Sequence, residues 1–421
     1  MNDSTPHSMP HTRKLTRIAR WSGCVAGILL GLTAGGAAYA TRTWDAPVAA
    51  PRPPIHADRS PAAVARGAAI FHSTCEICHR DGGSTRASGA PDGDAPAFLG
   101  RLHAPNLTSD PLHGIGAVAD EDIARMIRYG VKRSGHRGVM PTYGMGDADI
   151  AAVLGYLRSD DPLFSPDPSA SPPSTVSTLG KVVLVASGMS AVPDRPAAGV
   201  PVPDRSDTAA YGRYLAHDVF DCVGCHTPGY SPSKGAGPDM LAGGFEFDRP
   251  GGATVVSSNL TPDEPTGIGR YSRDDLGRAL RQGKRPDGRI LSAPMPIFRA
   301  LDDGDVNALY TYLRSLPPRR NDGVSRVAAA ASKDDPATMM PEARFRQLGC
   351  VGCHGKGAPH AGALARARDK SAEELARWIR NPERFVPGTQ MPTYAELLDE
   401  PGALELATWV KTGGPHELAT R

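Results

Sequence analysis

Residues 75–79 read CEICH, and the same C-x-x-C-H pattern returns as CVGCH at residues 222–226 and 350–354. This string is the attachment site of c-type haem. Its two cysteines lie one helical turn apart, so both can form thioethers on one porphyrin, and the histidine can bind the iron. The pattern therefore predicts three covalently bound haem c groups, held by Cys75, Cys78, Cys222, Cys225, Cys350 and Cys353, with His79, His226 and His354 as iron ligands.

Two other cysteine chemistries fit this pattern less well. A structural zinc site would need two cysteine pairs close together, whereas these pairs are separated by more than 100 residues and a histidine follows each one. A thioredoxin-like dithiol would not require that histidine. The regular recurrence of the histidine therefore favours haem.

The chain contains an internal repeat that extends beyond the haem motifs. Residues 106–138 and 259–291 align without a gap and share Asn-Leu-Thr, Gly-Ile-Gly and an amphipathic helix. Helices are also expected before each motif and at the end of each copy. Ser272 with Asp275 forms a capping-box pattern, as does Ser371 with Glu374 in a shorter third copy that lacks the two shared strings. The sequence predicts an all-α protein whose helices fold around haem.

The three copies define the predicted domains, and the stretches between them define the linkers. Its length indicates two to four domains, and its 47 glycines and 40 prolines predict long irregular connections. We expect the Pro/Ser-rich linker, including its apolar run Lys181–Val185, to lie extended against the domains. The predicted domains span 61–160, 207–317 and 339–421, with linkers at 41–60, 161–206 and 318–338.

The N-terminus has the features of an export signal. Residues 1–20 are basic and residues 21–40 are uncharged, an order that keeps the first end in the cytoplasm and sends the rest across the membrane. The uncharged segment is long enough for an anchor, although Ala38 to Ala40 matches a signal-peptidase site. The long polar extension favours a retained anchor, which predicts the periplasmic face of a bacterial inner membrane. Cleavage would leave a soluble periplasmic protein. The net charge of +2 gives no reason to expect nucleic acid as a partner.

The sixth iron position decides between an electron carrier and an enzyme, and it can be filled by Met, by His or by nothing. Met140, Met295 and Met391 each precede a proline, follow their haem motif and lie before a closing helix. This shared position predicts them as the sixth ligands. His136 is the alternative to Met140, whereas Met145 has no counterpart and is expected to pack in the core. His103 and His113 are expected to be ordinary surface residues.

The repeated NLTPDEPTGIG, its helix and the APMPIF…ALYTYLRSLPP ending resemble the multihaem cytochrome c subunits of membrane-bound bacterial dehydrogenases. Those subunits serve alcohol, gluconate, sorbitol or molybdenum-dependent aldehyde dehydrogenases in the periplasm. The likeness covers Pro61–Pro318, and the third domain is similar to class I cytochrome c through WIRNPERFVPGTQMPTY. It implies three class I cytochrome c-like domains in tandem, with iron ligand pairs His79/Met140, His226/Met295 and His354/Met391.

The resemblance also implies a function without a catalytic site in this chain. A partner dehydrogenase would supply electrons, and quinone, a terminal oxidase or a soluble cytochrome would accept them. The main alternative is a haem enzyme in its own right, a peroxidase or sulfur-compound oxidase, with one haem lacking its methionine. A redox sensor or structural module is a third hypothesis. The sequence does not identify the substrate of the dehydrogenase.

Overall fold

The computed structural model describes residues 31–81, 84–92, 95–230, 237–248, 254–291, 294–324, 339–355, 360, 362–367, 369–386, 389 and 391–413. Residues 1–20 and the first half of the expected anchor lie outside these ranges. Residues 31–45 are helical. Within the described ranges, no helix is both long and apolar enough to cross a membrane.

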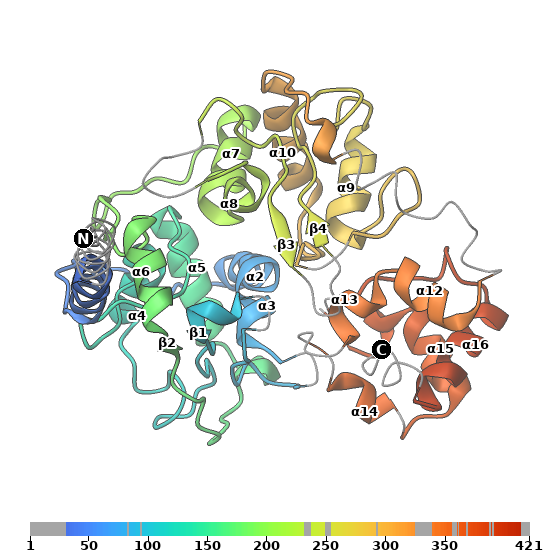
Figure 1. Ribbon diagram of the computed structural model, residues 1–421, viewed down its shortest axis with the longest axis horizontal. Helices are drawn as coiled ribbons and strands as arrows, with labels where there is room; N and C mark the ends of the chain where they lie inside the picture. Colours follow the sequence, from blue (N-terminus) through green and yellow to red (C-terminus); the bar gives the residue numbers. More distant parts are fainter. Residues whose placement is uncertain are drawn as a thin grey trace, which may run out of the picture.

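Three helical units follow one another along the chain, coloured blue to green, green to orange and orange to red in Figure 1. The first unit contains α2 (Pro61–Ile70), the π-helix η1 (Phe71–Cys75), α3 (Glu76–His79), η2 (Ala97–Leu99), β1 (Gly100–Arg101), α4 (Asp120–Tyr129), α5 (Asp147–Leu157) and η3 (Pro162–Phe164). The connection that follows contains β2 (Thr175–Val176) and α6 (Thr178–Ala186).

Each of the other two units likewise has a first helix, a short motif helix, a middle helix and a closing helix. The second contains α7 (Thr208–Tyr214), the π-helix η4 (Leu215–Val219), α8 (Cys222–His226), β3 (Glu246–Asp248), β4 (Thr254–Val256), α9 (Arg273–Gln282) and α10 (Asp303–Ser315). The third contains α12 (Pro341–Gln347), α13 (Cys350–His354), α14 (Ala363–Ala367), α15 (Ala372–Arg380), η6 (Pro382–Arg384) and α16 (Glu400–Lys411). The middle helices are α4, α9 and α15, and the closing helices are α5, α10 and α16. The strands form two short antiparallel pairs, β1 with β2 and β3 with β4. The helix-rich fold agrees with the all-α prediction.

Local sequence explains where the middle helices begin and end. Ser272 and Asp275 form the predicted capping box at the start of α9, and Ser371 caps α15 through the N–H of Glu374. Gly130 and Gly283 follow α4 and α9 with φ of 67° and 70°, a left-handed conformation that glycine adopts without strain. These glycines turn the chain into the loops that carry Met140 and Met295.

In the first two units, the first helix crosses the closing helix at very short range. A Cβ atom on Gly67 would lie 2.0 Å from the carbonyl oxygen of Ala152, and one on Gly212 would lie 1.9 Å from that of Ala308. Only glycine therefore allows α2 to pack on α5 and α7 on α10. Figure 1 shows α7 and α10 side by side.

The connection after the first unit differs from the sequence prediction. Residues 181–185 are not extended, because they form part of α6. Ser177 caps this helix by accepting a hydrogen bond from the N–H of Gly180 at 2.9 Å. Gly180 also lies against η2, where an added Cβ would meet the carbonyl oxygen of Leu99 at 2.6 Å. The cap and this close packing favour helix over an extended chain.

Two hydrophobic cores hold the described residues together. One core joins the first two units and includes Phe71, Leu154, Leu215 and Leu309. The other lies within the third unit and includes Phe345, Leu398 and Leu406. The first two units therefore share a single core, which the repeat pattern did not predict.

Candidate haem-binding sites

The three motif histidines lie in equivalent positions, each at the end of the short helix formed by its own C-x-x-C-H string. Each Nδ1 lies within hydrogen-bond distance of a backbone carbonyl oxygen: Pro105 at 3.0 Å for His79, Ser258 at 2.7 Å for His226 and His360 at 3.1 Å for His354. A carbonyl oxygen can only accept, so each Nδ1 donates. The Nε2 lone pair is then available to bind a metal.

Burial keeps these imidazoles neutral. It lowers the pKa of His79 and of His226, and it lowers the pKa of His354 to about 4, with the neighbouring His360 adding to that effect. A neutral imidazole with its Nδ1–H fixed is the form that ligates iron. The three histidines therefore have the chemistry that a haem iron requires.

The cysteine pairs are also suited to a covalently attached porphyrin. Cys75 and Cys222 pack against the core shared by the first two units, and Cys350 packs against the core of the third. Burial raises the pKa of each of these thiols to about 12. Because zinc binds thiolates, such surroundings disfavour a zinc site. The residues present fit haem c.

The shared Asn-Leu-Thr and Gly-Ile-Gly strings form the loop that supplies the histidine's carbonyl partner. In the first unit that partner, Pro105, comes directly before Asn106, whose Oδ1 accepts the N–H of Thr108 at 2.8 Å. The N–H of Ile115 then donates to the carbonyl oxygen of Thr108 at 2.8 Å. Gly114 lies so close that an added Cβ would be 2.2 Å from the same oxygen. The loop is thus fixed immediately beside the atom that orients His79.

The second unit repeats this loop. Ser258 precedes Asn259, whose Oδ1 accepts from Thr261 at 2.9 Å, and Ile268 N–H donates to Thr261 at 2.9 Å. The third unit lacks both strings, and His360 supplies the carbonyl six residues after His354. Sequence reasoning recognised the repeat but missed these carbonyls. The signal available was that the residue before Asn-Leu-Thr occupies the same place in both copies.

The three predicted methionines lie in loops of matching register. Met140, Met295 and Met391 are half-buried, and each packs against the core of its own unit. Three residues later, an aromatic residue donates its N–H to a carbonyl at the end of the middle helix: Tyr143 to Ile127 at 3.0 Å, Phe298 to Leu280 at 2.8 Å and Tyr394 to Arg380 at 3.2 Å. This hydrogen bond gives the three loops the same anchor.

The histidines and the second methionine near Met140 have different surroundings. His136 is exposed, and its Nδ1 lies 3.2 Å from Ser134 Oγ. Met145 is buried in the core, as expected of a packing residue. His113 is exposed, and the Nδ1 of half-buried His103 lies 2.9 Å from the carbonyl oxygen of Ala104.

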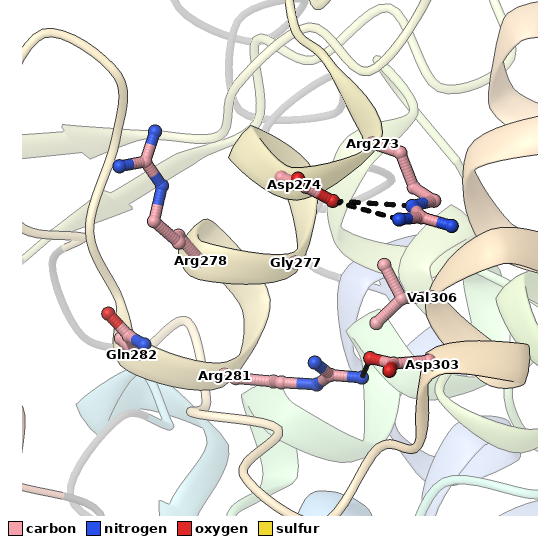
Figure 2. Close-up of a pocket in the computed structure, with 8 residues that line it drawn as sticks. All are labelled: Arg273, Asp274, Gly277, Arg278, Arg281, Gln282, Asp303 and Val306. Atoms are coloured by element: carbon pink, nitrogen blue, oxygen red, sulfur yellow. Dashed lines mark hydrogen bonds and ion pairs between the residues drawn. The ribbon is translucent and has the colours of Figure 1, made fainter.

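An arginine at the end of each middle helix closes the methionine loop. Arg281, on α9, donates to the carbonyl oxygen of Leu301 at 2.8 Å. It also donates to Asp303 at 2.7 Å (Figure 2). Both partners lie at the start of α10. The arginine therefore spans the two ends of the loop that contains Met295, as a charge-assisted pair with geometric specificity.

The first and third units contain the same arrangement. Arg128 donates to the Met145 carbonyl oxygen at 2.9 Å and to Asp147 at 2.8 Å. Arg380 donates to the Leu398 carbonyl oxygen at 3.1 Å and to Glu400 at 3.1 Å. Sequence reasoning missed these arginines. The available signal was an arginine at the end of each middle helix, followed by an acidic residue at the first position of the closing helix.

The arginines that line the hollow beside Arg281 are all paired with carboxylates. The hollow lies between α9 and α10, where Arg273 pairs with Asp274 and Arg281 with Asp303 (Figure 2). We therefore place the functional chemistry at the haem motifs.

The haem motifs of the first two units lie close together. Thr74 Oγ1 donates to the carbonyl oxygen of Val219 at 3.3 Å, which joins the residues just before the two cysteine pairs. Tyr143, beside the Met140 loop, is 9% exposed. Burial raises its pKa, and so do the nearby Cys75, Asp221, Cys78 and Cys225. Its hydroxyl group therefore lies near both cysteine pairs, which places the first two haem sites next to each other.

Comparisons with known proteins agree with this chemistry. Residues 62–157 match the family described as "Cytochrome C oxidase, cbb3-type, subunit III". The chain is 27% identical over 281 residues to the "Alcohol dehydrogenase (quinone), cytochrome c subunit" of Gluconacetobacter polyoxogenes, covering 62% of this chain and 57% of that protein. It is 27% identical over 352 residues to the "Fructose dehydrogenase cytochrome subunit" of Gluconobacter japonicus, covering 73% of this chain and 68% of that protein.

A third relative is more similar over a shorter region. The chain is 40% identical over 126 residues to the "Gluconate 2-dehydrogenase cytochrome c subunit" of Pantoea cypripedii, covering 30% of this chain and 25% of that protein. The chain thus spans about 57% of the length of the alcohol dehydrogenase subunit. These relatives confirm the resemblance to multihaem cytochrome c subunits of dehydrogenases that the sequence indicated.

Proposed function

We propose that this chain is a triheme c-type cytochrome with three class I cytochrome c-like domains in tandem, and that it transfers electrons for a partner dehydrogenase. The observation that carries the proposal is the threefold recurrence of one arrangement. Each unit has a motif histidine donating from Nδ1 to a carbonyl, a cysteine pair beside a core and a methionine loop closed by an arginine. Haem c, when bound, supplies reversible one-electron redox chemistry at its iron.

The chain's own residues would bind and orient each haem. His79, His226 and His354 would bind the irons on one side, and Met140, Met295 and Met391 on the other. The cysteine pairs would attach the porphyrins, and the apolar cores would pack beside them. Ligand identity and burial are levers by which a protein sets haem potential. The chain thus positions three redox centres at fixed places along one electron path.

The proposed donor is the catalytic subunit of a dehydrogenase, because the relatives carry the names of cytochrome subunits of alcohol, fructose and gluconate dehydrogenases. The proposed acceptor is quinone, a terminal oxidase or a soluble cytochrome. The basic residues 1–20, followed by the uncharged segment 21–40, support attachment to the periplasmic face of a bacterial inner membrane.

The haem-enzyme alternative requires an open or displaceable iron position. All three units contain a methionine in the same register, and each loop is closed by an arginine. Among the described residues, every unit has a methionine at the position proposed for the sixth iron ligand. The geometry therefore favours electron transfer over a peroxidase or sulfur-compound oxidase.

Replacing the methionines one at a time tests the proposal. Methionine sulfur bound to ferric haem gives a weak far-red absorption band. Met140→Ala, Met295→Ala and Met391→Ala are each expected to remove about one third of that band, since one of three iron–sulfur bonds is lost. His136→Ala is the matched control for the first site and should leave the band unchanged. An intact band in Met140→Ala, together with a new high-spin haem in His136→Ala, would instead assign the ligand to His136.

A further inference from the structure

One side chain of the second unit reaches the methionine loop of the third. Arg299 lies four residues after Met295, on the same loop. Its Nε donates to the carbonyl oxygen of Thr389 at 2.6 Å, and a terminal nitrogen donates to the carbonyl oxygen of Met391. The side chain is 16% exposed. The backbone of the proposed third methionine ligand is therefore bound from outside its own unit.

Around Arg299, the second and third units pack closely and carry opposite charges. An added Cβ on Gly283, at the end of α9, would lie 3.9 Å from Pro392 Cβ, so the two backbones approach closely. Lys284 pairs with Glu396, and Arg299 pairs with Glu383 at 3.3 Å. Both cations come from the second unit and both anions come from the third. The second unit thus presents a positive surface to the loop that carries Met391.

Arg299 also lies near the first haem motif. Burial lowers the pKa of Arg299, and the negative charges of Glu383 and of Glu76 oppose that effect. Glu76 is itself buried between Cys75 and Cys78 in the first motif. One guanidinium therefore lies where residues of all three units meet.

We propose that Arg299 is a positioning residue for Met391, through which the second unit sets the iron–sulfur bond and the reduction potential of the third haem. This inference rests on the proposed function, since it assumes that Met391 is the sixth ligand. Two N–H groups of one planar side chain hold the carbonyls on either side of residue 390. A lysine could keep the charge beside Glu383 but could not make both hydrogen bonds in that geometry.

A change in the Met391 loop should affect only the third haem. Axial ligation and nearby hydrogen bonding set haem potential, so a looser Met391 loop lowers the occupancy of the sulfur ligand and changes the potential of its iron. All three methionine loops are closed by an arginine of their own unit, but the hydrogen bonds of the Arg299 side chain go to backbone carbonyls of the Met391 loop. The effect should therefore be confined to the third site.

The test uses the full-length holoprotein and three variants. Arg299→Lys removes the paired hydrogen bonds and keeps the charge. Lys284→Met is the control, because it breaks the neighbouring ion pair with Glu396 and leaves the contacts to Thr389 and Met391 in place. Met391→Ala identifies the share of the far-red band, and the midpoint potential, that belong to the third haem. Haem content and unfolding midpoint are measured for each variant.

We expect Arg299→Lys to weaken the third-haem share of the band and to shift that haem's midpoint potential. The shift should correspond to at least a tenfold change in the ratio of oxidised to reduced haem, about 59 mV for one electron. The potentials of the other two haems and those of Lys284→Met should remain at their wild-type values.

Two results would overturn the inference. In the first, Met391→Ala removes one third of the band, while Arg299→Lys leaves both band and potential unchanged. In the second, Lys284→Met shifts the third haem as much as Arg299→Lys, which would show that docking of the units is what matters. A band that survives in Met391→Ala would instead refute the ligand assignment itself, and the inference with it.

Discussion

The first two units and the third unit use the same haem-binding arrangement but are assembled differently. The first two share one core, whereas the third has a core of its own. Much of this difference arises at the third residue of the closing helix, which is α5, α10 or α16 in the three units. This residue is a buried aspartate in the paired units, Asp149 and Asp305, and it is Gly402 in the third. The pairing of two units thus depends on buried charge that the third does not contain.

A single arginine joins the two aspartates. Arg66, on α2, donates to Asp149 at 2.9 Å and lies 3.5 Å from Asp305. Tyr214 of the second unit donates to Asp149 at 2.8 Å, and Tyr211 donates to Asp305 at 3.0 Å. The side chains of both aspartates are at most 6% exposed. Hydrogen bonds and opposite charge together compensate for the burial of these carboxylates.

Some features are common to the haem-binding arrangements of all three units, and others occur only where two units share a core. A carbonyl partner for histidine, a methionine loop in register and a closing arginine occur in all three units. Asn-Leu-Thr, Gly-Ile-Gly and the buried aspartate occur only in the paired units. We propose that these latter features stabilise a longer loop and the interface between the paired units, and that the haem-binding arrangement does not need them.

Replacing Arg66 should produce the largest difference in stability between the paired units and the third unit. Arg66→Met leaves buried Asp149 without its arginine, whereas Asp305 keeps its ion pair with Arg205 at 3.0 Å. Leaving a buried carboxylate without its cation typically costs about 3–5 kcal/mol. We expect the free energy of unfolding of the first two units to fall by that amount, measured in denaturant through their haem absorbance. The unfolding of the third unit should not change.

Arg344→Met is the matched control for this change. Arg344 is buried in the third unit and pairs with Glu405. Its replacement should destabilise the third unit alone. If Arg66→Met and Arg344→Met affected all three haems equally, the division into a pair and a separate unit would be wrong.

Acid should also distinguish the units, with a somewhat smaller effect. Burial lowers the pKa of His217 to about 4, below its ordinary value of 6.5. The folded state therefore binds this proton less readily than the unfolded state. The stability from neutral His217 is complete above pH 6.5 and is lost as the pH falls toward 4, by up to about 3 kcal/mol.

The third unit has no histidine at this place, because Phe345 and Trp409 form the contact that His217 and Tyr312 form in the second unit. Denaturant unfolding at pH 7 and pH 5 should show the second unit losing stability through this residue. His217→Gln should remove that part of the pH dependence while keeping a side chain that can bond to Tyr312. An unchanged pH dependence in His217→Gln would refute this assignment.

The smallest predicted effect concerns the helix caps. Ser272→Ala removes the capping box of α9, and Ser371→Ala removes the equivalent cap of α15. Each should lower the stability of its own unit by about 1 kcal/mol, measured as a shift in the denaturant midpoint. Because the first two units share a core, Ser272→Ala should shift both of their haem signals, whereas Ser371→Ala should shift one. A single-haem shift in Ser272→Ala would contradict the shared core.

The sequence predicted the local features well. The haem motifs, the repeat, the capping box at Ser272 and the register of the methionines all depend on residues close together in the chain. The helix at residues 178–186 was missed because its Pro/Ser-rich surroundings suggested an extended linker, although Ser177 was a usable cap signal.

Features that depend on distant residues could not be predicted. Nothing in the spacing of Arg66 and Asp305 indicates that they meet, since they lie in different repeats and their contact results from packing. The carbonyl partners of the histidines are backbone atoms, which leave no mark on residue type. The contact of Arg299 with residue 391 likewise requires knowledge of how two units pack.

The most direct test of the account is a quantitative spectrum of the intact holoprotein. Haem is counted per chain, and the far-red methionine–iron band and the carbon monoxide difference spectrum are recorded on the same sample. We predict three covalently bound, low-spin haems per chain, a band of threefold intensity relative to a single His/Met haem, and no rapid binding of carbon monoxide. A high-spin haem that binds carbon monoxide readily would contradict an electron-transfer role for all three sites and would favour the haem-enzyme alternative.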